Sequence, residues 1–197
     1  MNVSSTHRMT ATALLIAIGI AIPLFSPVKF VMEPASFTLA SHVAIFIAMF
    51  IDPAMGVAVA IGTTLGFQLA GFPLTIVIRA ASHLVFATLG GLYLKRHRET
   101  LSSPARALAF SLVIALIHAA CEFVVIYAFY ALGLMGQSLQ WVLMFVGVGS
   151  VIHSMVDFWI ALAVYKALNR QRSFASSFGG RPQRAEAARE EPKSGLG

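Results

Sequence analysis

Charged residues are scarce in this sequence. Asp, Glu, Lys and Arg make up 11% of its 197 residues, against roughly 25% in soluble domains. A chain of this size needs polar side chains to cover its water-facing surface if it folds in solution. Hydrophobic residues make up 58% of it instead. The deficit of charge excludes an ordinary soluble domain and favours a membrane protein.

Several functional signatures are also missing. Cys121 is the single cysteine, so no disulfide can form within the chain. The sequence contains no glycine-rich phosphate loop, no G-x-S-x-G elbow and no H-E-x-x-H pattern. We therefore expect neither an enzyme nor an ATPase site, and no cofactor of its own. The net charge of +6 comes largely from basic residues beside apolar segments, so we do not expect nucleic acid as a partner.

The apolar residues fall into segments long enough to cross a bilayer, which takes about 20 mostly apolar residues per helix. Proline, glycine and charged residues interrupt them, as at Asp52-Pro53 and in the Gly71-Phe72-Pro73 break. The predicted spans are residues 10–25, 37–51, 54–70, 74–94, 106–132 and 139–169. The predicted fold class is therefore an all-α membrane protein, a bundle of six transmembrane helices.

Basic residues predict the orientation of this bundle. Lys29 is the one basic residue in the connections on one side. The other side holds the following residues: Arg8, Lys95, Arg96, Arg98, Arg106, Lys166 and Arg170. Because basic loops face the cytoplasm, we predict cytoplasmic N- and C-termini in a multi-pass protein of the bacterial cell membrane. Residues 1–169 form the predicted transmembrane domain. Residues 170–197 are too polar to build a core and are predicted to be a disordered cytoplasmic tail.

Ionisable residues within the predicted spans are the strongest functional signal, because a charge at the bilayer centre costs at least roughly 2.5–3.5 kcal/mol. They occur in pairs spaced four residues apart, so that each pair shares one helix face. The pairs are Arg79 with His83, His118 with Glu122, and His153 with Asp157. From their depths we expect Arg79 and Glu122 to meet in the outer half of the bundle and the histidines to lie near mid-membrane. The result is a polar pocket that opens outward.

The same residues have a structural interpretation. Arg79 and Glu122 can simply neutralise each other, and any of the histidines can serve as a hydrogen-bonded core residue. Three histidines at similar depth can also bind a transition metal. We do not expect a metal, because no two histidines share a helix face at short spacing and carboxylates lie beside two of them.

Small residues form a second pattern. Ala13, Ala17 and Ala21 recur every four residues on the first span, and Gly62 and Gly66 do so on the third. Such stripes let another helix approach closely. The spacing alone leaves open whether the approaching helix belongs to this chain or to a partner.

Three segments resemble a known family. They are the stretch from Ile22 to His42 (IPLFSPVKFVMEPASFTLASH), the stretch from Gly62 to Pro73 (GTTLGFQLAGFP), and RAASH at 79–83. They are similar to the substrate-binding S components of energy-coupling-factor (ECF) transporters, and most of all to the niacin-specific S components. The resemblance covers about residues 10–169, which makes 1–169 the predicted substrate-binding domain.

The resemblance implies a six-helix protein that binds a vitamin near the outer face, beneath the loop between its first two helices. It also implies three partner subunits, a transmembrane T subunit and two cytoplasmic ATPases that use ATP. Ala13, Ala17 and Ala21 match the stripe with which S components dock on the T subunit. In the mechanism proposed for the family, the S component rotates in the membrane to deliver its ligand inward.

Nicotinate, a small aromatic anion, fits the predicted pocket. Arg79 is expected to pair with its carboxylate, a histidine to bond the pyridine nitrogen, and Trp141 or Tyr127 to stack on the ring. The full set of candidate substrate-binding residues is Arg79, His83, His118, Glu122, His42, Trp141, Tyr127 and Lys29. One alternative is a stand-alone proton-coupled transporter of a small organic anion, with its intramembrane histidines and carboxylates as a proton relay. The other is a structural or enzymatic membrane protein that uses the same polar groups.

Overall fold

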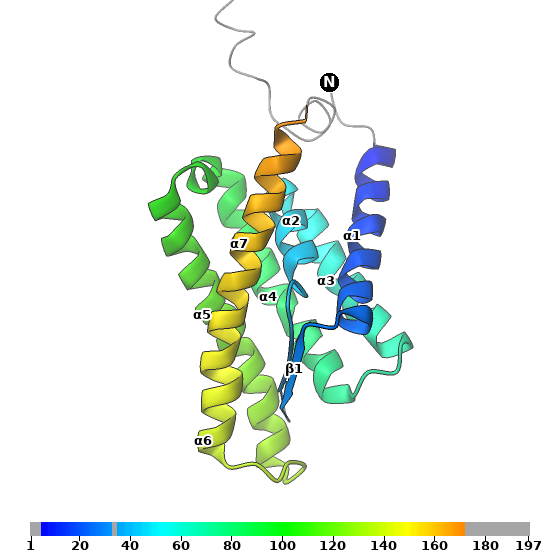
Figure 1. Cartoon of the computed structure of the whole chain (residues 1–197), viewed down its shortest axis with the longest axis vertical. Coiled ribbons are helices and arrows are strands. Elements are labelled where there is room, and N and C mark those ends of the chain that lie inside the picture. The colour runs from blue at the N-terminus through cyan, green and yellow to red at the C-terminus, as the bar shows by residue number, and fades with distance from the viewer. Residues whose placement is uncertain (1–4, 33–34, 172–197) are drawn as a thin grey trace, which may run out of the picture.

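The computed structural model describes residues 5–32 and 35–171. It is almost entirely helical, with one small β-hairpin (Figure 1). Four helical segments are long and apolar enough to cross a membrane: α1 (Ser5–Phe25), α4 (Leu74–Arg96), α5 (Pro104–Ala131) and the continuous stretch Leu139–Asn169. That last stretch consists of α6 (Leu139–Val142), the π-helical η2 (Leu143–Val148) and α7 (Gly149–Asn169). The predicted tail from residue 172 onward lies outside the described residues.

Two shorter helices complete the bundle. The 17-residue α3 (Pro53–Leu69) packs against α1 and α4, and the nine-residue α2 (Val43–Ile51) packs against α3 and α7. All nine residues of α2 are buried, so this helix forms the centre of the bundle. The turn predicted at Asp52-Pro53 separates the two helices. The Asp52 carboxylate accepts a hydrogen bond from the Ala54 N–H and caps α3, and Pro53 occupies the first helical turn.

The prediction for residues 26–51 was wrong in detail. Residues 37–51 were expected to form one transmembrane helix after a loop, but β1 (Lys29–Met32) and β2 (Ala35–Thr38) form an antiparallel pair, and α2 begins only at Val43. The residues around Phe37 alternate polar and apolar (Ser36, Phe37, Thr38), which suits a strand. Neither proline nor glycine separates this strand from α2, so the sequence shows no clear break between them.

The turn between β2 and α2 is held by a side chain from α7. Ala40 has a positive φ of 67°, a conformation that alanine adopts only at a cost. Asp157 accepts hydrogen bonds from the backbone N–H groups of Ala40 (2.8 Å) and His42 (2.9 Å). Non-helical backbone deep in a membrane protein must be satisfied within the protein, and a carboxylate at a helix N-terminus also complements its dipole. Asp157 thus fixes where α2 starts.

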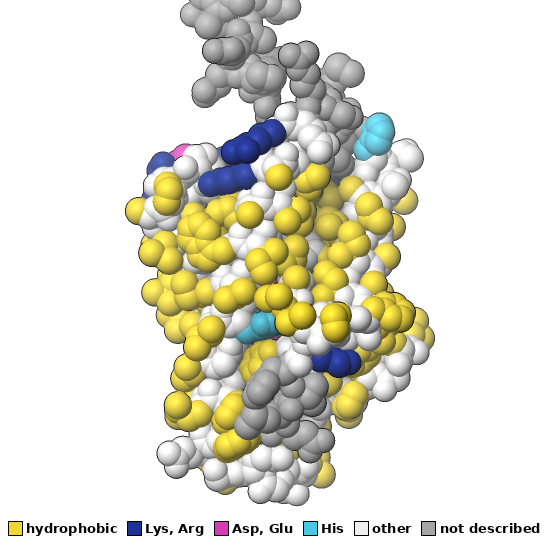
Figure 2. All heavy atoms as spheres, in the orientation of Figure 1, with side chains coloured by type: hydrophobic (Ala, Val, Ile, Leu, Met, Phe, Trp, Pro, Cys, Tyr) yellow, Lys and Arg dark blue, Asp and Glu magenta, His cyan; other side chains and the backbone are white. Residues whose placement is uncertain are grey.

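The two ends of the bundle differ in charge. The start of α1, the end of α7 and the connection from α4 to α5 lie at one end, and the hairpin lies in the other half (Figure 1). Basic side chains gather at the first of these ends, above a flank covered by apolar side chains (Figure 2). Lys95 and Arg96 finish α4 there and Lys166 lies in the last turn of α7. We call this the basic end and the opposite one the hairpin end.

The two stripes of small residues face different ways. A Cβ at Gly62 would collide with Ile16 of α1, and a Cβ at Gly66 would collide with Ile20. These glycines of α3 therefore allow α1 to pack closely within the chain. Ala13 and Ala17 are exposed on α1, and Ala21 is half-buried. Of the residues in the α1 stripe, two are therefore available to something outside the described chain.

Candidate functional site

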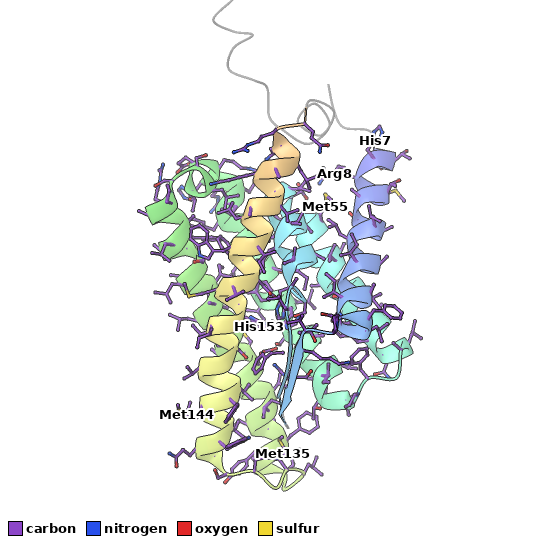
Figure 3. The ribbon with its side chains drawn as sticks, viewed as in Figure 1. His7, Arg8, Met55, Met135, Met144 and His153 are labelled. Carbon is purple, nitrogen blue, oxygen red and sulfur yellow. The ribbon has the colours of Figure 1, made fainter. Side chains whose placement is uncertain are left out.

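Six helices (α1, α2, α3, α4, α5 and α7) and the hairpin line a cavity of about 280 Å³, close to the lower limit for small-molecule sites of roughly 300–1,000 Å³. It lies in the hairpin half of the bundle. His153, which lines it, lies partway along α7 beside the hairpin (Figure 3). Its apolar wall includes Phe37, Ile45, Phe67, Phe72 and Ile76. Its polar wall includes Lys29, His42, Arg79, His83, Glu122 and His153.

Arg79 of α4 and Glu122 of α5 meet at this cavity, as the depths of the two residues predicted. Arg79 Nη2 lies 2.9 Å from Glu122 Oε2, and both side chains are buried. The same carboxylate oxygen accepts a hydrogen bond from the hydroxyl of Ser150 on α7. Arg79 Nε is buried without a hydrogen-bond partner among the described residues. A buried guanidinium seldom leaves a donor unused.

The second oxygen of Glu122 faces two histidines. Its Oε1 lies 3.3 Å from His83 Nε2 and 3.4 Å from His118 Nε2. The contact with His118 is not aligned as a hydrogen bond, and both ring nitrogens of this fully buried residue lack a hydrogen-bond partner in the described chain. Glu122 therefore stands between an arginine and a pair of imidazoles.

His42 joins these residues to Asp157. Its Nδ1 lies 3.0 Å from Asp157 Oδ2, and His153 Nε2 lies 3.4 Å from the same oxygen. The His42 ring centroid is 4.6 Å from those of His83 and His118 and 4.9 Å from that of His153. In the sequence, His42 stands without an ionisable residue four positions away, unlike the other three histidines. The structure makes it the centre of a four-histidine cluster, which we call the histidine cluster.

Not all the predicted site residues come together. Arg79, His83, Glu122, His42 and Lys29 line the cavity, and His118 lies directly behind Glu122.

Trp141 and Tyr127, predicted to stack on a ligand ring, do not line it. Trp141 packs on Phe145, and Tyr127 is half exposed beside Phe123.

The aromatic wall is built by residues that sequence reasoning missed. Phe37 of β2 holds its ring 5.7 Å from the Arg79 guanidinium carbon and 5.3 Å from the His153 ring. Phe67 of α3 and Phe72, in the turn between α3 and α4, pack together with ring centroids 4.8 Å apart and both line the cavity. The strand that carries Phe37 was not predicted, which is why its side chain was not placed in the pocket. Its signal in the sequence is the alternation of Ser36, Phe37 and Thr38.

A polytopic membrane bundle with a buried, charge-lined pocket has the architecture of a membrane transport protein. The sequence is 39% identical over 171 residues to the niacin transporter NiaX of Lactococcus lactis subsp. cremoris (strain MG1363), with 85% of this chain and 77% of that protein covered. The chain therefore belongs to the family of NiaX, the S components of ECF transporters, and is a multi-pass protein of the cell membrane. No family model and no solved structure matches it.

Proposed function

We propose that the chain is the substrate-binding subunit of a niacin importer and that nicotinate binds in the cavity beside the hairpin. The relative is named a niacin transporter. The observation that carries the proposal is the buried Arg79, which lines the cavity and whose Nε–H has no hydrogen-bond partner in the described part of the chain. A planar carboxylate suits a guanidinium because two parallel hydrogen bonds can form.

The rest of the cavity suits the rest of the ligand. The ring of nicotinate fits between the apolar wall and Phe37, where an offset or edge contact between aromatic rings is worth about 0.5–1.5 kcal/mol. Its pyridine nitrogen then faces His42 and His83. Lys29 is exposed at the rim, where a positive charge speeds the approach of an anion.

Calorimetric titration of the purified protein tests this assignment. We expect nicotinate to bind and nicotinamide, which lacks the charge, to bind far more weakly. Benzoate, which keeps the carboxylate and the ring shape but lacks the nitrogen, measures the contribution of the histidines. Equal affinity for nicotinate and nicotinamide would contradict a carboxylate clamp. Binding of a different vitamin with no response to nicotinate would reject the substrate.

We further propose that six membrane crossings occur, with the hairpin and α2 together forming the second, and that the basic end with both termini faces the cytoplasm. The positive-inside rule supports this orientation. Cysteine-accessibility labelling tests it in a variant in which Cys121 is replaced by serine. A cysteine at Gln137 should react with an impermeant thiol reagent added outside, and one at Glu99 only after permeabilisation.

Docking on a T subunit and two ATPases belongs to the same proposal. It is supported by Ala13 and Ala17, which are small and exposed on α1 while the glycine stripe is used internally. We expect Ala17→Trp to abolish co-purification with the T subunit and to leave nicotinate binding intact. Leu116→Trp on the exposed face of α5 is the matched control. A complex that survives Ala17→Trp would show that α1 does not dock in this way.

The second candidate function is proton-coupled transport, favoured by the chain of close contacts from Ser41 to His153, Asp157 and His42. Aromatic rings count against it. Phe46, Phe86 and Phe158 pack between the histidine cluster and the basic end. The ring centroid of Phe46 lies 5.4 Å from that of Phe86 and 5.5 Å from that of Phe158, and none of these side chains can relay a proton. Uptake into proteoliposomes driven by a pH gradient alone would favour this candidate over the importer subunit.

A further inference from the structure

The histidine cluster is larger than a carboxylate clamp requires. Arg79 can bind a carboxylate alone, yet His83 and His118 both face one oxygen of Glu122, and the ring of His42 lies against both of them. The rings of His42, His83 and His118 lie with centroids 4.6, 4.6 and 4.8 Å apart and are tilted against one another by 75°, 67° and 85°. No hydrogen bond joins one of these rings to another within the described residues. Their mutual arrangement is therefore not explained by bonds among them.

We propose that His42, His83, His118 and Glu122 form a site for a divalent transition metal at the wall of the cavity. One ligand atom from each of the four lies within 4.8 Å of all the others, and all four residues are buried. A tetrahedral site with metal–nitrogen bonds of about 2.1 Å separates its ligand atoms by roughly 3.4 Å, so a change in ring tilt closes the set. Imidazole and carboxylate donors suit Zn²⁺, Co²⁺ or Ni²⁺. The sequence led us to expect no metal, because it does not show that His42 lies beside His83 and His118.

Two features beyond proximity support the metal. His118 is fully buried, and neither of its ring nitrogens has a hydrogen-bond partner among residues 5–32 and 35–171, which is costly unless a ligand completes them. His42 binds Asp157 through Nδ1, which leaves its Nε2 for the metal. A carboxylate that bonds the second nitrogen of a metal-binding histidine is a usual support for such sites, because it fixes the ring and its tautomer.

The charge of the cavity gives the metal a role in substrate binding; this step rests on the proposed function. The described buried groups there are one arginine and two carboxylates, Glu122 and Asp157, which total −1 if the histidines are neutral. An anion would enter a site of its own sign, with Lys29 exposed at the rim. A divalent cation changes the total to +1. The metal would also bind Glu122 Oε1 and so neutralise part of the charge of this carboxylate. Arg79, which faces Oε2, would then be less neutralised by Glu122 and would attract the carboxylate of nicotinate more strongly.

The pyridine nitrogen is then a metal ligand. It is a donor of the same class as imidazole. With four protein ligands already bound, the metal would take the pyridine nitrogen as a fifth ligand, an expansion that tetrahedral sites allow, on the side where His42, His83 and Glu122 line the cavity. Nicotinate would bridge the metal and Arg79.

Metal binding is tested on the full chain, purified with a tag that contains no histidines. After dialysis against a chelator, titration with Co²⁺ should give one ion per chain and visible absorption of a site with nitrogen and oxygen ligands. We expect His118→Leu, which keeps the core apolar and filled, to abolish the absorption. Asp157→Asn should weaken Co²⁺ binding by about 10- to 100-fold. His97→Gln, at an exposed histidine of the basic end, is the matched control and should bind Co²⁺ as the parent does.

Ligand titrations separate this inference from the proposed function. Nicotinate should alter the Co²⁺ spectrum and benzoate should not, and removal of the metal should weaken nicotinate binding by about 5- to 150-fold. Unchanged nicotinate affinity in metal-free protein would overturn the role of the metal in nicotinate binding and leave the proposed function standing. Stoichiometric Co²⁺ binding that depends on His118, without any binding of nicotinate, would support the metal site and overturn the proposed substrate. Folded His118→Leu that still binds one Co²⁺ would overturn the site.

Discussion

The two halves of the bundle bury opposite kinds of side chain. Towards the hairpin end, α4, α5 and α7 direct Arg79, His83, His118, Glu122 and Asp157 inward around a cavity. Towards the basic end, the same helices and α2 bury an aromatic cluster of Phe46, Phe50, Phe86, Phe110 and Phe158. The change occurs within a single helical turn, where His83 touches Phe86. One half therefore serves recognition and the other holds the helices together.

The largest effect is expected from Arg79→Met. Nicotinate binding should fall below detection, and the protein should lose about 3–5 kcal/mol of stability because Glu122 is left as an uncompensated buried charge. Calorimetry and thermal unfolding in detergent measure the two effects. The double variant Arg79→Met with Glu122→Gln removes both charges and should recover most of the stability but none of the binding. Recovery of binding in the double variant would show that Arg79 only balances Glu122.

Phe158→Ala should have the opposite profile. Loss of this fully buried ring is expected to cost about 3–5 kcal/mol of stability, with nicotinate affinity unchanged in the protein that remains folded. Chemical denaturation and calorimetry at low temperature provide the measurements. Its neighbour Trp159 is much more exposed, so Trp159→Ala is the control and should cost far less. A large drop in affinity in Phe158→Ala would mean that the two halves are coupled.

Arg98→Ala should have a smaller effect at the basic end. The Arg98 guanidinium donates to the carbonyl oxygens of Phe50 (2.8 Å) and Ile51 (3.1 Å) and so closes the C-terminus of α2. Its removal leaves these carbonyls without that partner and should cost about 1–3 kcal/mol in the free energy of unfolding. Arg106→Ala breaks only a surface contact of 3.9 Å to Glu99 and should change stability by about 0–1 kcal/mol. If Arg98→Ala and Arg106→Ala lost the same stability, Arg98 would not act as a C-terminal cap of α2.

Lys29→Gln should give the smallest effect. The residue is exposed at the rim, so it should alter mainly the association rate of nicotinate and the dependence of that rate on salt, while the dissociation rate stays close to that of the parent. Stopped-flow binding at several ionic strengths measures this. An unchanged salt dependence would exclude electrostatic steering by Lys29.

Much of the helical framework could be predicted from the sequence because its breaks are chemical. Pro104 starts α5 and Asp52-Pro53 separates α2 from α3, as their local backbone preferences require. The pairing of Arg79 with Glu122 could be predicted as well, because the positions of two charges along opposed helices fix their depth. These inferences needed only helix geometry and the cost of burying charge.

The site itself could be predicted only in part. The place of His42 depends on a turn with Ala40 at positive φ and on the backbone bonds that Asp157 accepts from 115 residues away in sequence. Neither feature leaves a local pattern. Apolar composition also could not distinguish a strand from a helix around Phe37, so stacking was assigned to Trp141 and Tyr127 instead.

The short length of α2 has a consequence for the shape of the pocket. Nine residues of helix rise about 14 Å, roughly half of a hydrocarbon core of about 30 Å. The space beyond the N-terminus of α2 is occupied by the hairpin and by the cavity that the hairpin lines. A helix that continued through the hairpin half would fill this space, so the cavity depends on α2 starting as late as Val43.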